Sequence, residues 1–302
     1  MRKRQRGPAA YDRCSQYRPV QFRSLTEDQI CLLHEASLEI MARTGMRFHH
    51  QEALDLFKKA GATVSDGNLV RIQPHLVDWA LGTAPKNITI FDQTGKRAMA
   101  LGGYRTYFGP GSDCSHVYDL DTGERRQAVL NDVVQGVRLV DSLPCYDFVM
   151  SLFLPSDVPE DAYERRQMAV MLQESTKPIV FVGLEASSTV HAIEMATAVA
   201  GGLEQLERYP FIVNYVNAVS AFQHNDASVS RLLYAAERNL PTIYSPGKSR
   251  GTMAPMTVAA SLAVGNAGQL GGLVLSQLKR EGSPYLRAEP GGGGMDMRSM
   301  VS

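Results

Sequence analysis

The sequence predicts an α/β protein: an incomplete (β/α)8 barrel of TIM type, with about five βα units behind an N-terminal cap of helices and a β-hairpin. From residue 146 onward, short apolar runs alternate with helical stretches, and successive runs start 33, 32, 31 and 43 residues apart. This spacing indicates βαβ units and a parallel sheet. A closed barrel needs eight strands. The sequence supplies five, at Tyr146–Leu154, Ile179–Leu184, Phe211–Val216, Thr242–Tyr244 and Tyr285–Arg287.

The chain divides into three regions. Residues 1–24 are polar with interspersed basic and aromatic side chains, which indicates an extended arm lying on its own domain or on a neighbouring subunit of a homo-oligomer. Residues 25–144 combine helical patterns with short strands and form the cap. Residues 145–302 carry the alternating pattern and form the partial barrel.

The cap opens with three helices. Thr26 and Gln29 form a capping box ahead of an apolar helical face, and Gly45 is placed to stop that helix. A second helix is expected at 51–60, before Gly61. A third begins at Pro74, since proline is favoured in the first turn, and continues to Leu81.

A β-rich stretch and a further helix complete the cap. We expect strands at 88–91 and 106–108, and a hairpin from 116–119 and 125–128. The hairpin turn is Asp121-Thr122-Gly123, in which glycine supplies a positive φ. Asn131 is the expected N-cap of the helix that leads into the first barrel strand.

Each helix of the barrel region has its own start or stop signal. The expected helices run from Pro159-Glu160-Asp161 to Glu174, from after Ser187-Ser188 to Gly201-Gly202, from Asn225-Asp226 to Arg238, and from Thr252 to Lys279.

The composition sets broad limits on function. The 302 residues are 44% hydrophobic and 21% charged, as in ordinary soluble globular proteins. The 31 basic and 31 acidic residues cancel, which gives no indication of a nucleic-acid partner or an anionic membrane surface. The basic N-terminus is not followed by the apolar segment of a secretory signal, and no run of about 18 apolar residues could span a membrane. We expect a cytoplasmic protein.

In a (β/α)8 barrel the active site lies at the C-terminal ends of the strands. In the third strand, alternation places Asn214 and Val216 on one face and Tyr215 and Asn217 on the other, so polar side chains of one set should reach the barrel mouth. Hydrogen bonding at a strand end would explain these residues equally well. The candidate substrate-binding residues are Asn214, Tyr215, Asn217, Tyr244, Glu289, Asp296 and Arg298; no catalytic residue is assigned.

Other chemistries find little support. Gly291–Gly294 lacks the spacing of a phosphate-binding motif. His116 and His224 lack the clustered partners of a zinc site, so no metal site is predicted. The cysteines have no metal-ligand or Cys-x-x-Cys spacing: Cys14, Cys31, Cys114 and Cys145. Lys248, just after a strand, keeps a Schiff-base lyase or aldolase as an alternative.

Four stretches, in their order and spacing, resemble the trimethylamine methyltransferase family of corrinoid-dependent enzymes. The resemblance covers nearly the whole chain from about residue 25. The stretches are Asp121–Arg126, Arg138–Pro144, Thr176–Ile179 and a block at Gly251–Ala260 that continues through Asn266-Ala267 to Gln277-Leu278.

The resemblance implies a TIM-barrel enzyme that moves a methyl group from a methylated amine to the Co(I) corrinoid of a small partner protein, with no cofactor bound permanently. It also implies a longer polypeptide. The position that separates pyrrolysine-containing users of trimethylamine from users of quaternary amines such as glycine betaine lies beyond Ser302. A non-catalytic amine-binding protein or an inactive fragment is the remaining alternative.

Physical chemistry sets requirements for such a site. A quaternary ammonium loses its charge as the methyl group leaves, so a very strong hold on the cation would stabilise the ground state more than the transition state. Aromatic faces bind a cation moderately; the candidates are Tyr215, Tyr244, Phe153 and Phe181, although core packing is the expected role of both phenylalanines. Arg298 could bind the carboxylate of a betaine. The leaving amine is neutral and needs no general acid.

Overall fold

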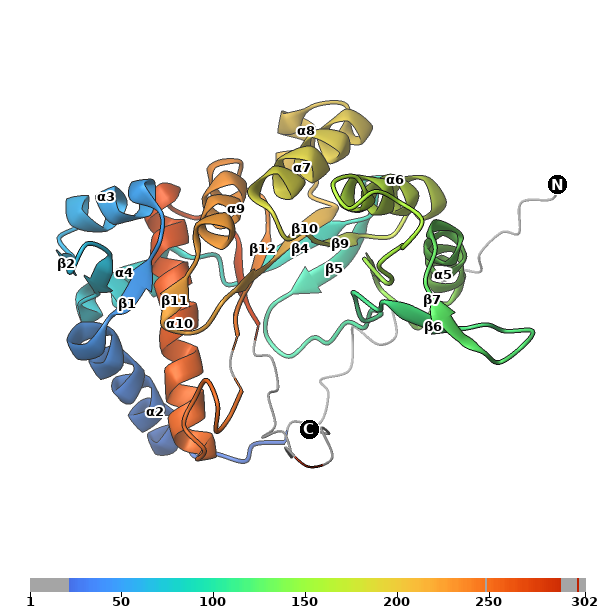
Figure 1. Cartoon of the computed structure of the whole chain (residues 1–302). Helices are drawn as coiled ribbons and strands as arrows, with labels where there is room; N and C mark the ends of the chain where they lie inside the picture. The colour runs from blue at the N-terminus through green and yellow to red at the C-terminus, as the bar shows by residue number, and fades with distance from the viewer. Residues whose placement is uncertain (1–21, 248, 289–297, 299–302) are drawn as a thin grey trace.

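Five parallel strands form the centre of the structure (Figure 1), a computed structural model that describes residues 22–247, 249–288 and 298. The sheet has the order β13-β12-β10-β9-β8, so its five strands lie side by side in the order in which they follow one another along the chain. The α/β prediction with five successive parallel strands is confirmed, although the first strand is much shorter than expected. The strands are β8 (Val149–Met150), β9 (Ile179–Val182), β10 (Ile212–Ala218), β12 (Thr242–Pro246) and β13 (Tyr285–Arg287).

A helical crossover joins each strand to the next. These helices are α6 (Tyr163–Glu174), α7 (Ala186–Ala200) with the short α8 (Leu203–Arg208), α9 (Asp226–Glu237) and α10 (Val258–Lys279). Two of them begin later than expected, at Tyr163 and Val258, because turns occupy the segments before them. Consecutive parallel strands with helical crossovers are the repeating unit of a (β/α)8 barrel. The described residues do not close a barrel.

The two faces of the sheet have different neighbours. Ile179, Phe181 and Ile212 belong to a core shared with α6 and α7. The opposite face includes Val213 and Tyr215 and packs against a hairpin of β4 (Ile88–Phe91) and β5 (Arg97–Leu101).

The hairpin of β4 and β5 is attached to the N-terminal edge of the sheet. The Phe91 amide donates to the carbonyl of Pro210, just before β10, at 2.8 Å, and the Gln93 amide donates to that of Thr176, just before β9, at 2.9 Å. We call the face covered by this hairpin the inner face. Its C-terminal edge lies at the other end of the strands from these attachments.

The prediction of a strand at 106–108 is wrong, and β4 pairs with β5 instead. Gly102 and Gly103 have φ values of 139° and 62°, which turn the chain away from the ladder before residue 106. Tyr107 instead contacts the hairpin through its side chain, whose hydroxyl accepts a hydrogen bond from the Ala100 amide at 2.9 Å. The aromatic residues of this run suggested a strand, but they anchor a loop.

The N-terminal helices follow the sequence signals. In α2 (Glu27–Glu39), the Gln29 amide donates to Thr26 Oγ1 and the Thr26 amide donates to Gln29 Oε1, which confirms the capping box. The helix ends in a π turn, η1 (Ile40–Thr44), and stops at Gly45 with φ 75°. Helices α3 (Gln51–Lys59) and α4 (Pro74–Thr83) lie where they were expected.

A four-stranded sheet in the cap was not predicted. Its strands are too short for a period-two pattern to show. β1 pairs with β11 in parallel, through Arg47 with Gln223 and Phe48 with His224, so the cap is joined to the loop that follows β10. The strands are β1 (Met46–Phe48), β2 (Thr63–Ser65), β3 (Leu69–Arg71) and β11 (Gln223–His224), in the order β11-β1-β3-β2.

The second hairpin of the cap is confirmed as β6 (His116–Tyr118) and β7 (Arg125–Gln127), with Gly123 at φ 72° in its turn. Helix α5 (Leu130–Ser142) has Val129 as its N-cap, so the prediction of Asn131 is wrong by two residues. The Val129 amide donates to Asp132 Oδ2 at 2.8 Å, and this carboxylate secures the helix start in place of an asparagine side chain.

Glycines allow α10 to lie close to both the loop that follows β10 and the central sheet. A Cβ atom on Gly268 would lie 2.6 Å from the Ala221 Cα, and one on Gly272 would lie 2.5 Å from the ring of Tyr244. In the described part of the chain α10 is the one helix long and apolar enough to cross a membrane by length and composition, and 72% of its apolar window is buried inside the protein. Packing therefore accounts for its composition.

We expect Gly268→Ala to lower the free energy of unfolding by about 1–3 kcal/mol, because the added methyl meets backbone that cannot move aside cheaply. Chemical denaturation of the variant measures this loss. Gly82→Ala in α4 is the matched control, since nothing lies within 4 Å of its Cβ position and alanine favours a helix. Equal stability changes in the two variants would contradict the close approach of α10.

Candidate functional site

Polar side chains lie along the edge where β8, β9 and β10 end. These strands stop at Met150, Val182 and Ala218, and loops lead from there into the crossover helices. The groups at this edge are two carboxylates and a phenol from outside the strands, Asp113, Glu164 and Tyr163, and two residues of β10, Tyr215 and Asn217.

Asp113 reaches this edge from the connection between β5 and β6. Its amide donates to the Ser151 carbonyl at 2.9 Å and the Cys114 amide to that of Leu152 at 3.0 Å, which fixes the loop beside the chain that continues from β8. Asp113 has φ 62°, a left-handed conformation that is uncommon for residues other than glycine. Non-glycine residues in strained backbone conformations cluster at functional sites.

The carboxylate of Asp113 has no cationic partner among the residues that the structure describes. Within the described ranges no lysine or arginine forms an ion pair with it, and its one side-chain hydrogen bond comes from Ser112 Oγ at 2.7 Å. Asp113 is exposed by surface area, but the protein around its carboxyl still removes part of the solvent, and this raises the pKa of Asp113. The Ser112 hydrogen bond opposes that shift and the charge of Glu164 adds to it. A carboxylate in these surroundings would be stabilised by a bound cation.

Glu164 belongs to the first turn of α6, and its carboxylate lies at the N-terminal end of α7. One carboxylate oxygen accepts a hydrogen bond from the Leu184 amide at 2.6 Å, and the other accepts one from Ser188 Oγ. The positive end of the helix dipole favours a carboxylate there. Burial, followed by the charges of Glu164 and Asp113, raises the pKa of Tyr163 to about 12, so this phenol stays protonated at neutral pH.

Two sequence candidates, Asn214 and Tyr244, lie on the opposite face of the sheet. Asn214 is buried, and its Oδ1 accepts a hydrogen bond from Thr189 Oγ1 of α7 at 3.1 Å. Tyr244 is fully buried beneath α10, and its hydroxyl is hydrogen bonded to Nδ1 of His224 at 2.7 Å. Both side chains are enclosed by helices, so the candidate site does not include them.

The aromatic environment of Tyr244 is also structural. The His224 ring stacks on Phe48 at 4.3 Å between centroids, and burial lowers the pKa of this histidine to about 3, so it is neutral. The two phenylalanine candidates, Phe153 and Phe181, belong to the core between the sheet and its helices.

Three of the other sequence candidates are described by the structure, and the rest lie outside the described residues. Tyr215 is half-buried on the inner face, and Asn217 is exposed two residues further along the same strand. Arg298 is exposed. The candidates outside the described residues are Glu289 and Asp296, together with Lys248 and the Gly291–Gly294 loop.

Sequence reasoning missed Asp113 and Glu164. Asp113 follows Gly109-Pro110-Gly111-Ser112, a run of turn-forming residues that signals a loop but not its position. In the sequence, Glu164 is one of many acidic residues found in the first turn of a helix, which does not indicate a functional site. Asp113 reaches this edge through its backbone contact with Ser151, and Glu164 through its side-chain contact with Ser188. Neither contact can be predicted from the sequence.

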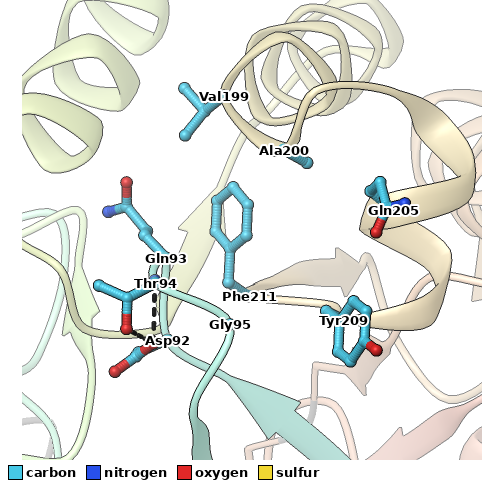
Figure 2. A pocket seen from close by; sticks show the side chains of 9 residues that line it. All are labelled: Asp92, Gln93, Thr94, Gly95, Val199, Ala200, Gln205, Tyr209 and Phe211. Atoms are coloured by element: carbon cyan, nitrogen blue, oxygen red, sulfur yellow. Dashed lines mark hydrogen bonds between the residues drawn. The ribbon is translucent and has the colours of Figure 1, made fainter.

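Two cavities lie away from this edge. One, of about 200 Å³, is at the N-terminal edge between the β4–β5 turn and α7–α8 (Figure 2), where Thr94 is hydrogen bonded to Asp92. The other, of about 600 Å³, lies between α2 and α10. Neither is lined by the residues at the C-terminal edge. Across residues 22–247, 249–288 and 298, no group of three or more histidine, cysteine or acidic side chains is arranged to hold a metal ion.

Comparison with known proteins establishes the family. The model of the trimethylamine methyltransferase (MTTB) family matches residues 2–300. The chain belongs to the MTTB family.

Curated relatives are similar over most of this chain. Trimethylamine methyltransferase MttB of Desulfitobacterium hafniense is 29% identical over 264 residues, which are 86% of this chain and 53% of that protein. Glycine betaine methyltransferase of another strain of that species is 25% identical over 87% of this chain and 54% of its own length. Proline betaine:corrinoid methyltransferase of Eubacterium limosum is 26% identical over 84% and 54%. The chain thus spans about half the length of the curated relatives it matches.

Two of the stretches that resemble the MTTB family have a structural role here. Lys177 Nζ donates to the carbonyls of Val140 and Leu143, at 2.6 and 2.7 Å, and so satisfies the C-terminal end of α5. Asp141 accepts hydrogen bonds from Ser175 Oγ at 2.8 Å and the Thr176 amide at 3.3 Å. These contacts hold the start of β9 against α5, at the opposite end from the candidate site.

Proposed function

We propose that the complete polypeptide transfers a methyl group from a methylated ammonium compound to the Co(I) corrinoid of a small partner protein. The match of the MTTB family to residues 2–300 carries this proposal. In the reaction the carbon–nitrogen bond breaks and its electron pair stays on nitrogen, which leaves a neutral amine. Co(I) supplies the two electrons of the new carbon–cobalt bond.

The proposed architecture is a (β/α)8 barrel of which this chain supplies five strands. An arm at 1–24 and a cap at 25–144 precede a partial barrel at 145–302. Two observations support it: strands and helices alternate in sequential order, and β8 and β13, at the two ends of the sheet, each pair on one side only among the residues described. In a closed barrel both strands would have a second neighbour.

The proposed site lies at the C-terminal edge of the inner face. Asp113 provides a negative charge for the ammonium group, Tyr215 an aromatic face, and Asn217 a polar contact. Arg298 stays a candidate for the carboxylate of a betaine, and Glu289 and Asp296 stay candidates from the sequence. A partly solvated carboxylate such as that of Asp113 suits a substrate whose charge disappears in the transition state, because it holds the cation without excessive ground-state stabilisation.

The alternative of a lyase or aldolase depends on Lys248, which lies outside the described residues. A version of that enzyme that binds a phosphate gains nothing from this edge. A phosphate would favour the N-terminus of a crossover helix. At α7 that position already holds the carboxylate of Glu164. The nearby Asp113 adds to the repulsion of an anion.

The reaction is tested by mixing the complete polypeptide with a reduced corrinoid protein and, in turn, trimethylamine, glycine betaine, proline betaine and L-carnitine. We expect the visible spectrum of Co(I) to give way to that of methyl-Co(III) with at least one amine, with one demethylated amine formed per methyl transferred. No spectral change with any of them, while a known relative reacts under the same conditions, would overturn the proposal.

We expect Tyr215→Leu to raise the KM for the amine about 2- to 30-fold, because one aromatic face contributes about 0.5–2 kcal/mol to cation binding. Steady-state kinetics measure the change. Tyr215→Phe is the matched control, since it keeps the ring and removes the hydroxyl. If the phenylalanine variant lost as much affinity as the leucine variant, the aromatic face would not be the binding element.

A further inference from the structure

Two side chains of α9, one helical turn apart, hold the end of β10. Arg231 Nη2 donates to the carbonyl of Tyr215, and Ser228 Oγ donates to the carbonyl of Asn217. These are the two β10 residues whose side chains form the proposed site. Ser228 Oγ also lies 2.7 Å from Asn225 Oδ1, so the single hydroxyl proton has two acceptors within reach. With the Asn225 amide flipped, its NH2 group would donate to the hydroxyl and the proton would serve the Asn217 carbonyl alone.

The contacts occur where β10 loses a neighbour. Tyr215 pairs with Val182, the last residue of β9, and beyond this point β10 continues without β9 beside it. Carbonyls near the end of a ladder need donors from elsewhere. Arg231 and Ser228 supply donors at two such carbonyls, so α9 fixes a strand end that the sheet itself no longer holds on that side.

Arg231 is an unusual residue for this position. Its side chain is 2% exposed, and no carboxylate in the described part of the chain forms an ion pair with it. Burial lowers the pKa of Arg231 to about 10, while the charges of Glu164 and Glu185 favour its charged form, so it remains a cation at neutral pH. Buried charges without a paired counter-charge cost stability, and apolar side chains of similar volume would pack without that cost.

Arg231 also ties the strand to α7. Its Nε donates to Thr189 Oγ1 at 3.0 Å, and Thr189 in turn donates to Asn214 at 3.1 Å. One guanidinium therefore links α9, α7 and β10 behind the site. Its planar, forked geometry allows donation in two directions, which a lysine reproduces only in part.

We infer that Arg231 and Ser228 are positioning residues, which hold the C-terminal end of β10 so that Tyr215 and Asn217 keep their places at the C-terminal edge. The inference rests on the proposed function for its catalytic consequence, but the restraint on the strand is a property of the fold. Small displacements of groups that contact a substrate can lower rates about 100-fold.

The test uses the complete polypeptide with Arg231→Gln, Arg231→Lys, Ser228→Ala and Val229→Ala. Val229 is fully buried on the same helix, and its apolar side chain donates no hydrogen bond to either carbonyl, so Val229→Ala reports the effect of a weaker core alone. Hydrogen exchange of the peptide covering residues 212–219 is measured for each variant, with the β4–β5 hairpin as internal reference. Methyl-transfer kinetics are measured in parallel.

We expect faster exchange at the end of β10 in Arg231→Gln and Ser228→Ala, with the reference unchanged, and a partial effect in Arg231→Lys. We expect kcat to fall about 10- to 100-fold for Arg231→Gln. The fall should be smaller for Ser228→Ala and for Arg231→Lys. A further variant, Arg231→Ala, is used for chemical rescue, and added guanidinium ion should restore part of its exchange protection and of its rate. Arg231→Lys and Ser228→Ala keep the test valid if the other arginine variants do not fold.

The positioning role would be overturned if the Arg231 and Ser228 variants changed hydrogen exchange at residues 212–219 and in the β4–β5 hairpin only as Val229→Ala does. Unchanged exchange at β10 in all variants would overturn it as well. An unaltered protein that transfers no methyl group would overturn the proposed function instead. In that case the exchange measurements still decide whether Arg231 and Ser228 restrain the strand.

Discussion

A protein made of residues 1–302 alone is expected to give no methyl transfer and to associate in solution. The sheet ends at β8 and β13, and each of these outer strands pairs with a neighbouring strand on one side only in the described structure. Strand edges left open in this way promote pairing with other chains. A site built from five strands also lacks the groups that the other three strands of a barrel would contribute. The expected effect on the rate is complete loss.

Light scattering coupled to size exclusion, over a range of concentrations, measures the association. The control is a fusion in which the corresponding C-terminal part of trimethylamine methyltransferase MttB from Desulfitobacterium hafniense follows residue 302. We expect the fusion to be less prone to associate. A monomeric 1–302 protein that unfolds cooperatively and turns over an amine would contradict the half-barrel account.

Asp113→Asn is expected to lower kcat/KM for cationic amines about 10- to 100-fold, because a hydrogen bond or contact with a charged group is worth about 1.5–3 kcal/mol. Asparagine tolerates the left-handed backbone of this residue and keeps the side-chain shape. The loss should therefore come from the missing charge. Kinetics with each amine measure it, and Asp121→Asn, in the exposed turn between β6 and β7, is the matched control.

The same substitution should not reduce stability. The folded state raises the pKa of Asp113, so the folded protein binds this proton more tightly than the unfolded chain. The free energy of unfolding therefore falls as pH rises from the unfolded pKa through the folded pKa, and the penalty is complete above both. We expect Asp113→Asn to be at least as stable as the unaltered protein at pH 7, with the difference shrinking at acid pH. A marked loss of stability at pH 7 would make Asp113 a structural residue.

The parts of the fold set by local signals could be predicted from the sequence. The capping box at Thr26, the stop at Gly45 and the strand–helix alternation after residue 146 all depend on neighbouring residues. The sheet of β1, β2, β3 and β11 could not, because strands of two or three residues show no period and Phe48 meets His224 only in the folded chain. At 106–108, glycines before the run outweighed its β propensity.

The site shows a similar division. Alternation correctly separates Tyr215 and Asn217 from Asn214. It does not show which set lies on the inner face, because strands of a parallel sheet are apolar on both faces. Asp113 arrives from a loop that the sequence places outside the barrel region. Its role depends on a backbone contact with Ser151, 38 residues further along the chain, and no local pattern encodes that contact.

The central claim is that a methylated cation binds at the C-terminal edge beside Asp113 and Tyr215. The most direct measurement is the crystallographic position of tetramethylarsonium, a heavy isostere of a quaternary ammonium, located by its anomalous signal in the complete polypeptide. The account predicts an arsenic position in contact with the Asp113 carboxylate and the Tyr215 ring. An arsenic position in the cavity beside Asp92 at the opposite edge, or between α2 and α10, with none at the C-terminal edge, would contradict it.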